Sequence, residues 1–234
     1  MMSDIVSSPH RIGEAKPAPQ PVIRPRVLIT GACRGLGRYC AEALAGRGAE
    51  LLLCDIDDRA LRTTAEQLGA AAHFRCDVAS DASVAAMANE VSKQFSSLDM
   101  LINAAGGGYA RTLGMYRVSR ALIPALRLGG HQLLINVPPA PQDAQAPAFP
   151  YASSRLAFHR LSAALAYEAR GMPIAVMIAC PAKRQLVPVY PDPNAGTWAD
   201  ICDLRRPSEE EVRTLASQVA GLLDPHPEAR LSAG

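Results

Sequence analysis

Residues 30–37 read Thr30-Gly31-Ala32-Cys33-Arg34-Gly35-Leu36-Gly37, and this stretch decides the fold. An apolar run at 26–29 precedes it, and an Ala-rich segment with apolar residues at helical spacing follows at 38–45. Glycine in a turn from strand to helix lets the backbone adopt positive φ and lets a phosphate approach closely. The first turn of the helix then offers unpaired N–H groups to an anion. A generic tight turn is the alternative interpretation, but the position between a strand and a helix favours a dinucleotide site.

A carboxylate ends the next apolar run. Residues 50–54 are mostly apolar, and Asp55 follows where a second parallel strand should finish. A carboxylate at that point can accept hydrogen bonds from the adenosine ribose hydroxyls and would repel a 2′-phosphate. The alternative is an ordinary polar residue at the start of a loop, since Asp57 and Asp58 follow within three residues. We favour the ribose role and expect NAD(H) over NADP(H), although Arg34 is a cation inside the glycine turn that could serve a phosphate.

Apolar strands and amphipathic helices alternate from residue 26 onward. This order predicts an α/β fold with a doubly wound parallel sheet and helices on both faces. A ligand then belongs at the carboxyl ends of the strands. We expect six strands and a possible vestigial seventh at Arg230-Leu231-Ser232. The expected strands are 26–30, 50–54, 72–76, 98–102, 131–137 and 173–179, and the expected helices are 36–47, 57–68, 80–95, 112–128, 151–170 and 208–223.

Composition favours one compact domain. At 234 residues, 49% of them hydrophobic, the chain is long enough to bury a sizeable core, and we expect a single domain over 26–234. Residues 1–25 combine Ser, Pro and isolated charges without apolar periodicity, which predicts a disordered, Pro-rich tail. The net charge of +2 gives no reason to expect nucleic acid as a partner, and no apolar run reaches membrane-span length.

The six cysteines are scattered without metal-ligand spacing, so no metal site is expected. Reduced, buried thiols are the default interpretation, which together with the absence of a signal peptide indicates the cytoplasm. Cys33 differs because it lies in the phosphate turn, beside a helix N-terminus that is expected to lower its pKa. A small packing residue is still favoured there over a redox switch.

Three further motifs follow the glycine turn in order: Cys76-Asp77-Val78, Asn103-Ala104-Ala105-Gly106 and Tyr151-Ala152-Ser153-Ser154-Arg155. Together with that turn they resemble the short-chain dehydrogenase/reductase family, from about residue 26 to the C-terminus. The resemblance implies a Rossmann-type sheet that binds a dinucleotide. The residues that it assigns to the cofactor are Gly31, Arg34, Gly35, Leu36, Gly37, Asp55, Asp77, Val78, Asn103, Ala104, Tyr151 and Arg155.

The resemblance also identifies the catalytic positions. In the family, a tyrosine exchanges the proton, a lysine lowers its pKa, a serine binds the substrate oxygen and an asparagine completes a proton path. Here Tyr151 and Arg155 are the candidate catalytic residues, with Arg155 in place of the lysine. Pro138-Pro139 stands at the serine and Arg111 at the asparagine, and proline has neither a hydroxyl nor an N–H.

Three of the four catalytic positions therefore depart from the family pattern. We interpret the chain as an NAD(H)-binding protein with weak or lost oxidoreductase activity, which acts as a sensor, a scaffold or a subunit of a complex. The alternative is a divergent NAD(P)(H)-dependent oxidoreductase that acts on a carbonyl or alcohol substrate through Tyr151.

Two expected helices, 112–128 and 151–170, carry long apolar faces. They predict a homodimer, or a protein complex through the same face, rather than a tetramer, because the C-terminal strand of the family's tetramer interface is reduced. His159 lies in the second of these helices and is expected on the dimer or core side rather than as a base.

Overall fold

The computed structural model describes residues 24–106, 108–138, 148–190 and 207–224. Strands and helices alternate along these segments as the sequence predicts. The elements are β1 (Arg26–Thr30), α1 (Gly35–Ala45), β2 (Glu50–Asp55), α2 (Asp58–Leu68), β3 (Ala72–Arg75), α3 (Asp81–Gln94), β4 (Met100–Asn103), α4 (Gly108–Leu126), β5 (Leu133–Asn136), α5 (Ala148–Glu168), β6 (Ala175–Cys180), η1 (Pro181–Lys183), β7 (Gln185–Pro188) and α6 (Glu209–Gly221).

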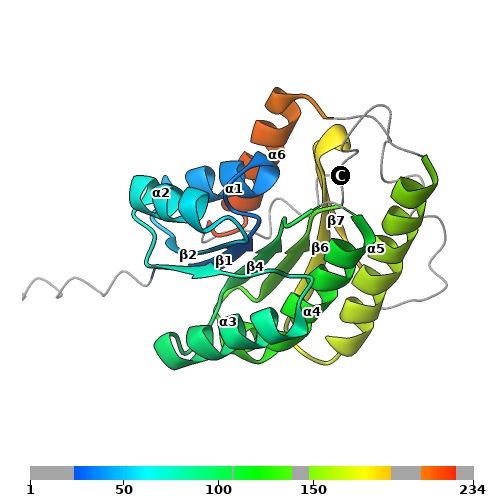
Figure 1. The fold of residues 1–234 in the computed structure, drawn as a ribbon. Coiled ribbons are helices and arrows are strands. Elements are labelled where there is room, and N and C mark those ends of the chain that lie inside the picture. Colours follow the sequence, from blue (N-terminus) through cyan, green and yellow to red (C-terminus); the bar gives the residue numbers. More distant parts are fainter. Residues whose placement is uncertain (1–23, 107, 139–147, 191–206, 225–234) are drawn as a thin grey trace, which may run out of the picture.

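These strands form one sheet in the order β3-β2-β1-β4-β5-β6-β7. Strands β1 to β6 pair in parallel, and β7 pairs antiparallel with β6. Figure 1 shows α1, α2 and α6 on one face of the sheet and α3, α4 and α5 on the other. The predicted α/β class, with a doubly wound sheet of Rossmann type, is confirmed.

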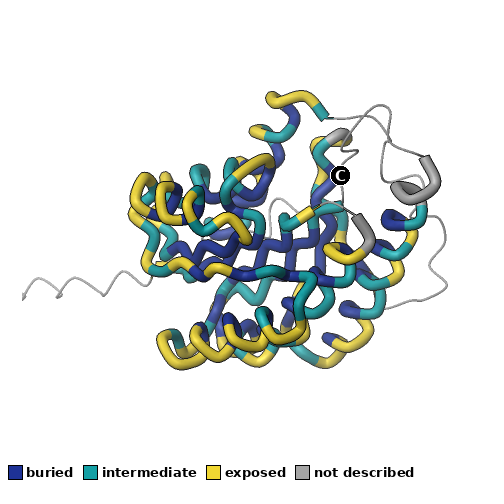
Figure 2. Tube along the Cα trace, in the orientation of Figure 1, coloured by how far each residue is buried: buried dark blue, intermediate teal, exposed yellow. Residues whose placement is uncertain are grey.

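Each face of the sheet has its own hydrophobic core. In β1, Val27 and Ile29 pack with α1 and α6, whereas Leu28 packs with α3, α4 and α5. This alternation follows from the two-residue period of a strand, and it explains why β1, β2 and β4 are apolar almost throughout. Figure 2 shows the strands as a buried layer between partly exposed helices. The sheet is therefore a rigid platform for residues at the carboxyl ends of its strands.

Local capping explains several helix starts. The side chains of Asp57 and Ser80 accept backbone N–H groups in the first turns of α2 and α3. At α6, Ser208 and Glu211 form the reciprocal capping box, with hydrogen bonds of 3.2 and 2.8 Å. Two helices begin earlier than predicted, α4 at Gly108 instead of 112 and α5 at Ala148 instead of 151. Gly108 therefore belongs to the first turn of α4.

The seventh strand is one that the sequence analysis did not predict. Strand β7 follows β6 after the short helix η1, and Arg184 makes the reversal in a left-handed conformation, with φ of 53°. It covers the outer edge of β6, where Cys180 pairs with Gln185 and Met177 pairs with Pro188. The vestigial strand expected at 230–232 lies outside the described residues. The sheet edge beside β6 is thus taken by the segment that comes directly after β6.

Candidate functional site

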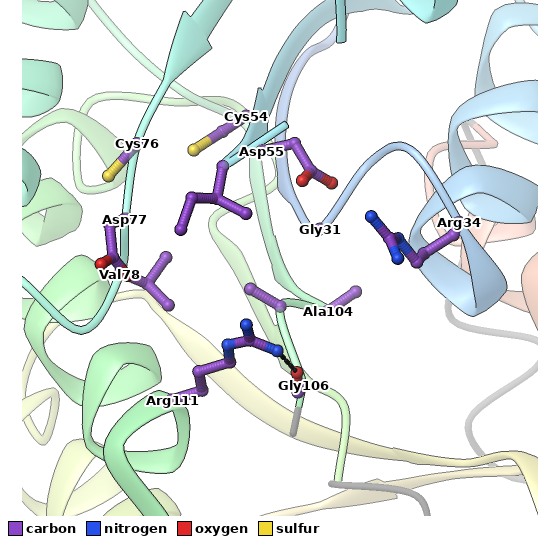
Figure 3. A pocket seen from close by; sticks show the side chains of 12 residues that line it. Gly31, Arg34, Cys54, Asp55, Cys76, Asp77, Val78, Ala104, Gly106 and Arg111 are labelled. Carbon is purple, nitrogen blue, oxygen red and sulfur yellow. Dashed lines mark hydrogen bonds between the residues drawn. The ribbon is translucent and has the colours of Figure 1, made fainter. Parts of the chain in front are cut away.

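A pocket opens at the carboxyl ends of β1, β2 and β4, beside the segment after β3 and the first turns of α4 (Figure 3). Six of the residues predicted to bind the cofactor line it: Gly31, Arg34, Asp55, Asp77, Val78 and Ala104. The other lining residues are Cys54, Ile56, Cys76, Ala105, Gly106 and Arg111. Gly35, Leu36, Gly37, Asn103 and Arg155 are not among them, and the side chain of Tyr151 lies outside the described part of α5.

The glycine turn is shaped by two close backbone approaches. A Cβ on Gly31, whose φ is 66°, would lie 2.7 Å from the carbonyl oxygen of Ala104. A Cβ on Gly37 would lie 2.3 Å from the carbonyl oxygen of Gly31. Only glycine fits either position, so the start of α1 is held tightly against β1 and β4. Helix α1 has no acidic residue in its first turn and no side-chain cap, which leaves its N-terminal N–H groups for an anion.

Asp55 is held at the floor of the pocket by backbone groups. One carboxylate oxygen accepts the N–H of Cys33 at 3.1 Å, and the other accepts the N–H of Asp57 at 3.2 Å. The residue is buried but lines the pocket. Because each carboxylate oxygen has further lone pairs, Asp55 can still accept hydrogen bonds from a ligand hydroxyl.

The expectation that the start of α1 lowers the pKa of Cys33 is wrong. Burial and the negative charge of Asp55 raise the pKa of its thiol to about 11, although it stands beside the start of α1. The Cys33 thiol is therefore protonated at neutral pH. This agrees with a packing role rather than a reactive one.

Two other cysteines interact at the pocket wall, which the sequence analysis did not foresee. Cys54 lies in β2 and Cys76 directly follows the neighbouring strand β3, and their thiols are hydrogen-bonded to each other. The bond from Cys54, with a further one from Ser83, lowers the pKa of the Cys76 thiol, whereas the bond to Cys76 and burial raise the pKa of Cys54. Only the strand register, which the sequence does not give, brings the two together.

Arg111 enters the pocket from the first turns of α4. One guanidinium nitrogen donates to the carbonyl oxygen of Gly106 at 3.0 Å, and the side chain is otherwise exposed. In Figure 3 it approaches from the side opposite Arg34. The sequence analysis assigned Arg111 to the asparagine position but not to the cofactor pocket. The short connection from Gly106 to α4 is what brings it there, and its positive charge was the available signal.

A buried polar network lies behind the pocket. The side-chain amide of Asn103 donates to Ser119 Oγ and to Asn136 Oδ1, both at 2.9 Å. Asn136 in turn donates to Ser162 Oγ at 3.3 Å. The network ties β4 and β5 to α4 and α5, and places Asn103 as a structural support for the backbone that leads to Ala104. Its own Oδ1 is buried without a partner among the described residues.

The catalytic half predicted from the sequence lies at β5 and α5. Pro138 is two residues beyond the end of β5, and Arg155 is buried within α5. Burial, and secondly the charge of Arg155, lower the pKa of His159 to about 4, so this histidine is neutral. It contacts the Phe158 ring edge to face, with ring centroids 5.5 Å apart. His159 is therefore a core residue, in line with the sequence analysis.

In the described segments, no group of three or more His, Cys, Asp or Glu side chains is arranged to hold a metal ion. None of the helices in these segments combines the length and the apolarity needed to cross a membrane.

Comparison with known proteins identifies the family. Residues 25–120 match the model of the short chain dehydrogenase family. L-Fucose dehydrogenase of Oryctolagus cuniculus is 28% identical over 193 residues, which cover 72% of this chain and 68% of the relative. Several other curated relatives are matched over less than half of their length.

Two solved structures carry bound cofactors. A Pseudomonas aeruginosa RhlG/NADP active-site complex matches with a TM-score of 0.64 and 25% identity, over 85% of this chain and 91% of that one. A 3-ketoacyl-(acyl-carrier-protein) reductase from Brucella melitensis, complexed with NADH, matches with a TM-score of 0.56 and 26% identity, over 66% and 75%. The chain belongs to the short-chain dehydrogenase/reductase family of NAD(P)-binding oxidoreductases.

Proposed function

We propose that the protein binds NAD(H) in this pocket and has weak or lost oxidoreductase activity, so that it acts as a sensor, a scaffold or a subunit of a complex. The observation that carries the proposal is the pair of substitutions at the substrate end. Pro138-Pro139 stands where the resemblance places the family's serine, and Arg111 stands on α4 where it places the asparagine. We also propose that residues 26–234 form a single domain.

The preference for NAD(H) rests on Asp55. Its two hydrogen bonds from backbone N–H groups fix the carboxylate at the end of β2. There it can accept hydrogen bonds from the hydroxyls of the adenosine ribose. A 2′-phosphate at the same point would meet a buried negative charge. Arg34 favours NADP(H) instead, because its cation could pair with a 2′-phosphate. Its side chain is 77% exposed, and it pairs with the Asp57 carboxylate at a distance of 3.8 Å.

The proposed loss of activity follows from what hydride transfer needs. A bound nicotinamide supplies or accepts the hydride, and the protein must polarise the substrate oxygen and move a proton to or from it. Proline cannot donate a hydrogen bond, and loss of one such donor lowers turnover by about a hundredfold or more. The guanidinium of Arg155 keeps the positive charge of the family's lysine but not its compact geometry.

The alternative is a divergent oxidoreductase. Tyr151 and Arg155 are four residues apart in α5, the spacing at which two residues share one face of a helix. A cation at that position lowers the pKa of a phenol and would favour proton transfer by Tyr151. L-Fucose dehydrogenase, one of the similar proteins, is named for a sugar substrate, which points to a polyhydroxylated substrate for this alternative.

Two measurements separate these functions. Calorimetric titration with NAD⁺, NADH, NADP⁺ and NADPH tests the cofactor site. A steady-state screen of carbonyl and alcohol substrates, including sugars and polyols, tests the chemistry. The proposal expects NAD(H) binding without turnover in the ordinary range. Turnover that is abolished by Tyr151→Phe would establish the alternative instead.

The proposal also covers assembly and location. We propose a homodimer, or a complex with another protein, through α4 and α5, in the cytoplasm. The support is the exposed apolar surface of α5, where Leu156 is 63% exposed and Tyr167 is 46% exposed.

A further inference from the structure

Two guanidinium groups reach the pocket from different helices. Arg34 precedes α1, and Arg111 lies in the first turns of α4. Both line the pocket, and Figure 3 shows them on opposite sides of Gly31 and Ala104. The glycine turn between them presents the N-terminus of α1. The positive charge at the pocket is therefore on two walls and not at the glycine turn alone.

The charge on Arg111 is not neutralised by the protein. Its guanidinium donates to the neutral carbonyl of Gly106, and no carboxylate among the described residues pairs with it. An arginine side chain has five N–H donors in a planar fork, so most of them remain for a ligand. Arg120 of the same helix differs, because it is paired with Glu168. Arg111 is thus placed and charged to bind an anionic group inside the pocket.

The walls of the pocket come from one half of the sheet. Its lining residues belong to β1, β2 and β4, to the segments that follow β2, β3 and β4, and to α4. Among the described residues, none from β5, α5 or β6 lines it. In this family of folds that half receives the adenosine and the diphosphate of a dinucleotide. Asp55 and Asp77 offer carboxylates to the adenosine part, and the two arginines flank the rest.

The other half of the site offers less to a nicotinamide. Pro138 presents no donor beyond β5, and β7, which follows β6 after η1, is paired with β6 along the sheet edge. A backbone N–H that donates to β6 is not available to donate to a cofactor amide. Most of the binding free energy should therefore come from the adenosine diphosphate part of the ligand.

We propose that Arg34 and Arg111 form a two-sided clamp on the diphosphate, and that the ligands of this site are adenosine diphosphate compounds in general. ADP-ribose and ADP bind about as well as NAD⁺, and the nicotinamide adds little affinity. This inference rests on the proposed dinucleotide pocket. It gives Arg111 a binding role at the position where the family has an asparagine for proton transfer.

Calorimetry of the full chain with NAD⁺, ADP-ribose, ADP and adenosine tests the clamp. We expect Kd values for NAD⁺ and ADP-ribose within about threefold of each other. Charge-assisted hydrogen bonds are the strong class, so Arg111→Ala and Arg34→Ala should each weaken ADP and ADP-ribose by about tenfold. Adenosine, which has no phosphate, should bind these variants as it binds the unmodified protein. Arg111→Lys should recover part of the affinity, because it restores the charge without the fork.

The matched control is Arg120→Ala, which removes the same charge from the same helix outside the pocket and should leave all four Kd values unchanged. Thermal unfolding of each variant shows that it is folded. NAD⁺ binding more than about thirtyfold tighter than ADP-ribose would overturn the inference and leave the proposed function standing. An equal loss of adenosine affinity in Arg111→Ala would overturn the diphosphate clamp. Failure of every ligand to bind the unmodified protein would instead contradict the proposed function itself.

Discussion

The Asp55 carboxylate accepts the backbone N–H of Cys33 at 3.1 Å and thereby joins the end of β2 to the glycine turn after β1. One residue thus has two tasks, because the same carboxylate also lines the pocket. It fixes the turn against which a diphosphate would lie, and in the proposed site it would present an acceptor to the ribose. The proximity of this charge also keeps the Cys33 thiol protonated. Replacement of Asp55 therefore changes the shape of the turn as well as the specificity.

Asp55→Asn should weaken NAD(H) binding by about tenfold. It should also reduce the ratio of the affinity for NAD(H) to the affinity for NADP(H). The amide keeps the size of the carboxylate and one acceptor oxygen, but it loses the charge that repels a 2′-phosphate. Asp55→Ala should in addition lower the free energy of unfolding by about 1–3 kcal/mol, because buried N–H groups lose their acceptor. Titration with both cofactors and denaturant unfolding check the two effects. Tighter binding of NADP(H) than of NAD(H) by the unmodified protein would refute the ribose assignment.

The glycines of the turn should differ sharply in their tolerance to alanine. Gly37→Ala places a Cβ against the backbone of Gly31, which cannot move without shifting β1, and should cost about 3 kcal/mol or more. Gly35→Ala meets no atom within 4 Å and loses only the left-handed conformation at φ of 56°, about 1–2 kcal/mol. Urea unfolding of the two variants side by side measures the difference. Equal losses would contradict the close approach.

The fold could be predicted from the sequence because its signals are local. The glycine turn and the periodicity of each element are patterns among neighbouring residues, and a strand that is buried on both faces is recognised as a short apolar run. Strand β7 could not be predicted in the same way. Its residues, Gln185 to Pro188, have no apolar alternation that marks a strand, and their pairing with β6 depends on the reversal at Arg184.

The candidate site was predictable only in part, for a related reason. Gly31, Asp55 and Asp77 lie at the end of β1, β2 and β3 or within two residues beyond it, so their meeting at one sheet edge follows from parallel pairing. The place of Arg111 depends instead on how few residues separate Gly106 from α4, and the Cys54–Cys76 contact depends on the β2–β3 register. The pKa of Cys33 depends on a carboxylate 22 residues away. Such long-range contacts have no signature in a short window of sequence.

Restoring the family's catalytic residues should raise activity if the scaffold is still competent. The variant combines Pro139→Ser, Arg155→Lys and Arg111→Asn, which return a hydroxyl, a compact ammonium and a proton path. We expect kcat at saturating cofactor to rise by about a hundredfold over a barely detectable starting value. Saturation matters because Arg111→Asn is expected to weaken the cofactor. Adding Tyr151→Phe is the control, and it should abolish the gain.

His159 should make the protein less stable in acid. Burial and the charge of Arg155 hold its pKa at about 4, below the ordinary 6.5, so the unfolded chain binds the proton more readily. The contribution of His159 to the free energy of unfolding is therefore complete above pH 6.5. It is lost between pH 6.5 and 4, by about 1.4 kcal/mol per pH unit. His159→Phe, which keeps a ring beside Phe158, should flatten this part of the pH profile in denaturant unfolding. An unchanged slope would contradict the assignment.

Assembly should depend on the outer face of α5. Leu156 and Tyr167 are 11 residues apart, close to three helical turns, so they lie on one stripe of the helix and are both exposed. An isologous dimer would bury this stripe against its symmetry mate. Leu156→Asp should then convert the dimer to a monomer in light scattering at micromolar concentration. Tyr190→Asp, at an exposed large side chain beyond the end of β7 and outside α4 and α5, is the control and should leave the dimer intact. A tetramer in the unmodified protein would contradict the argument, and a monomer would leave this face for a different protein.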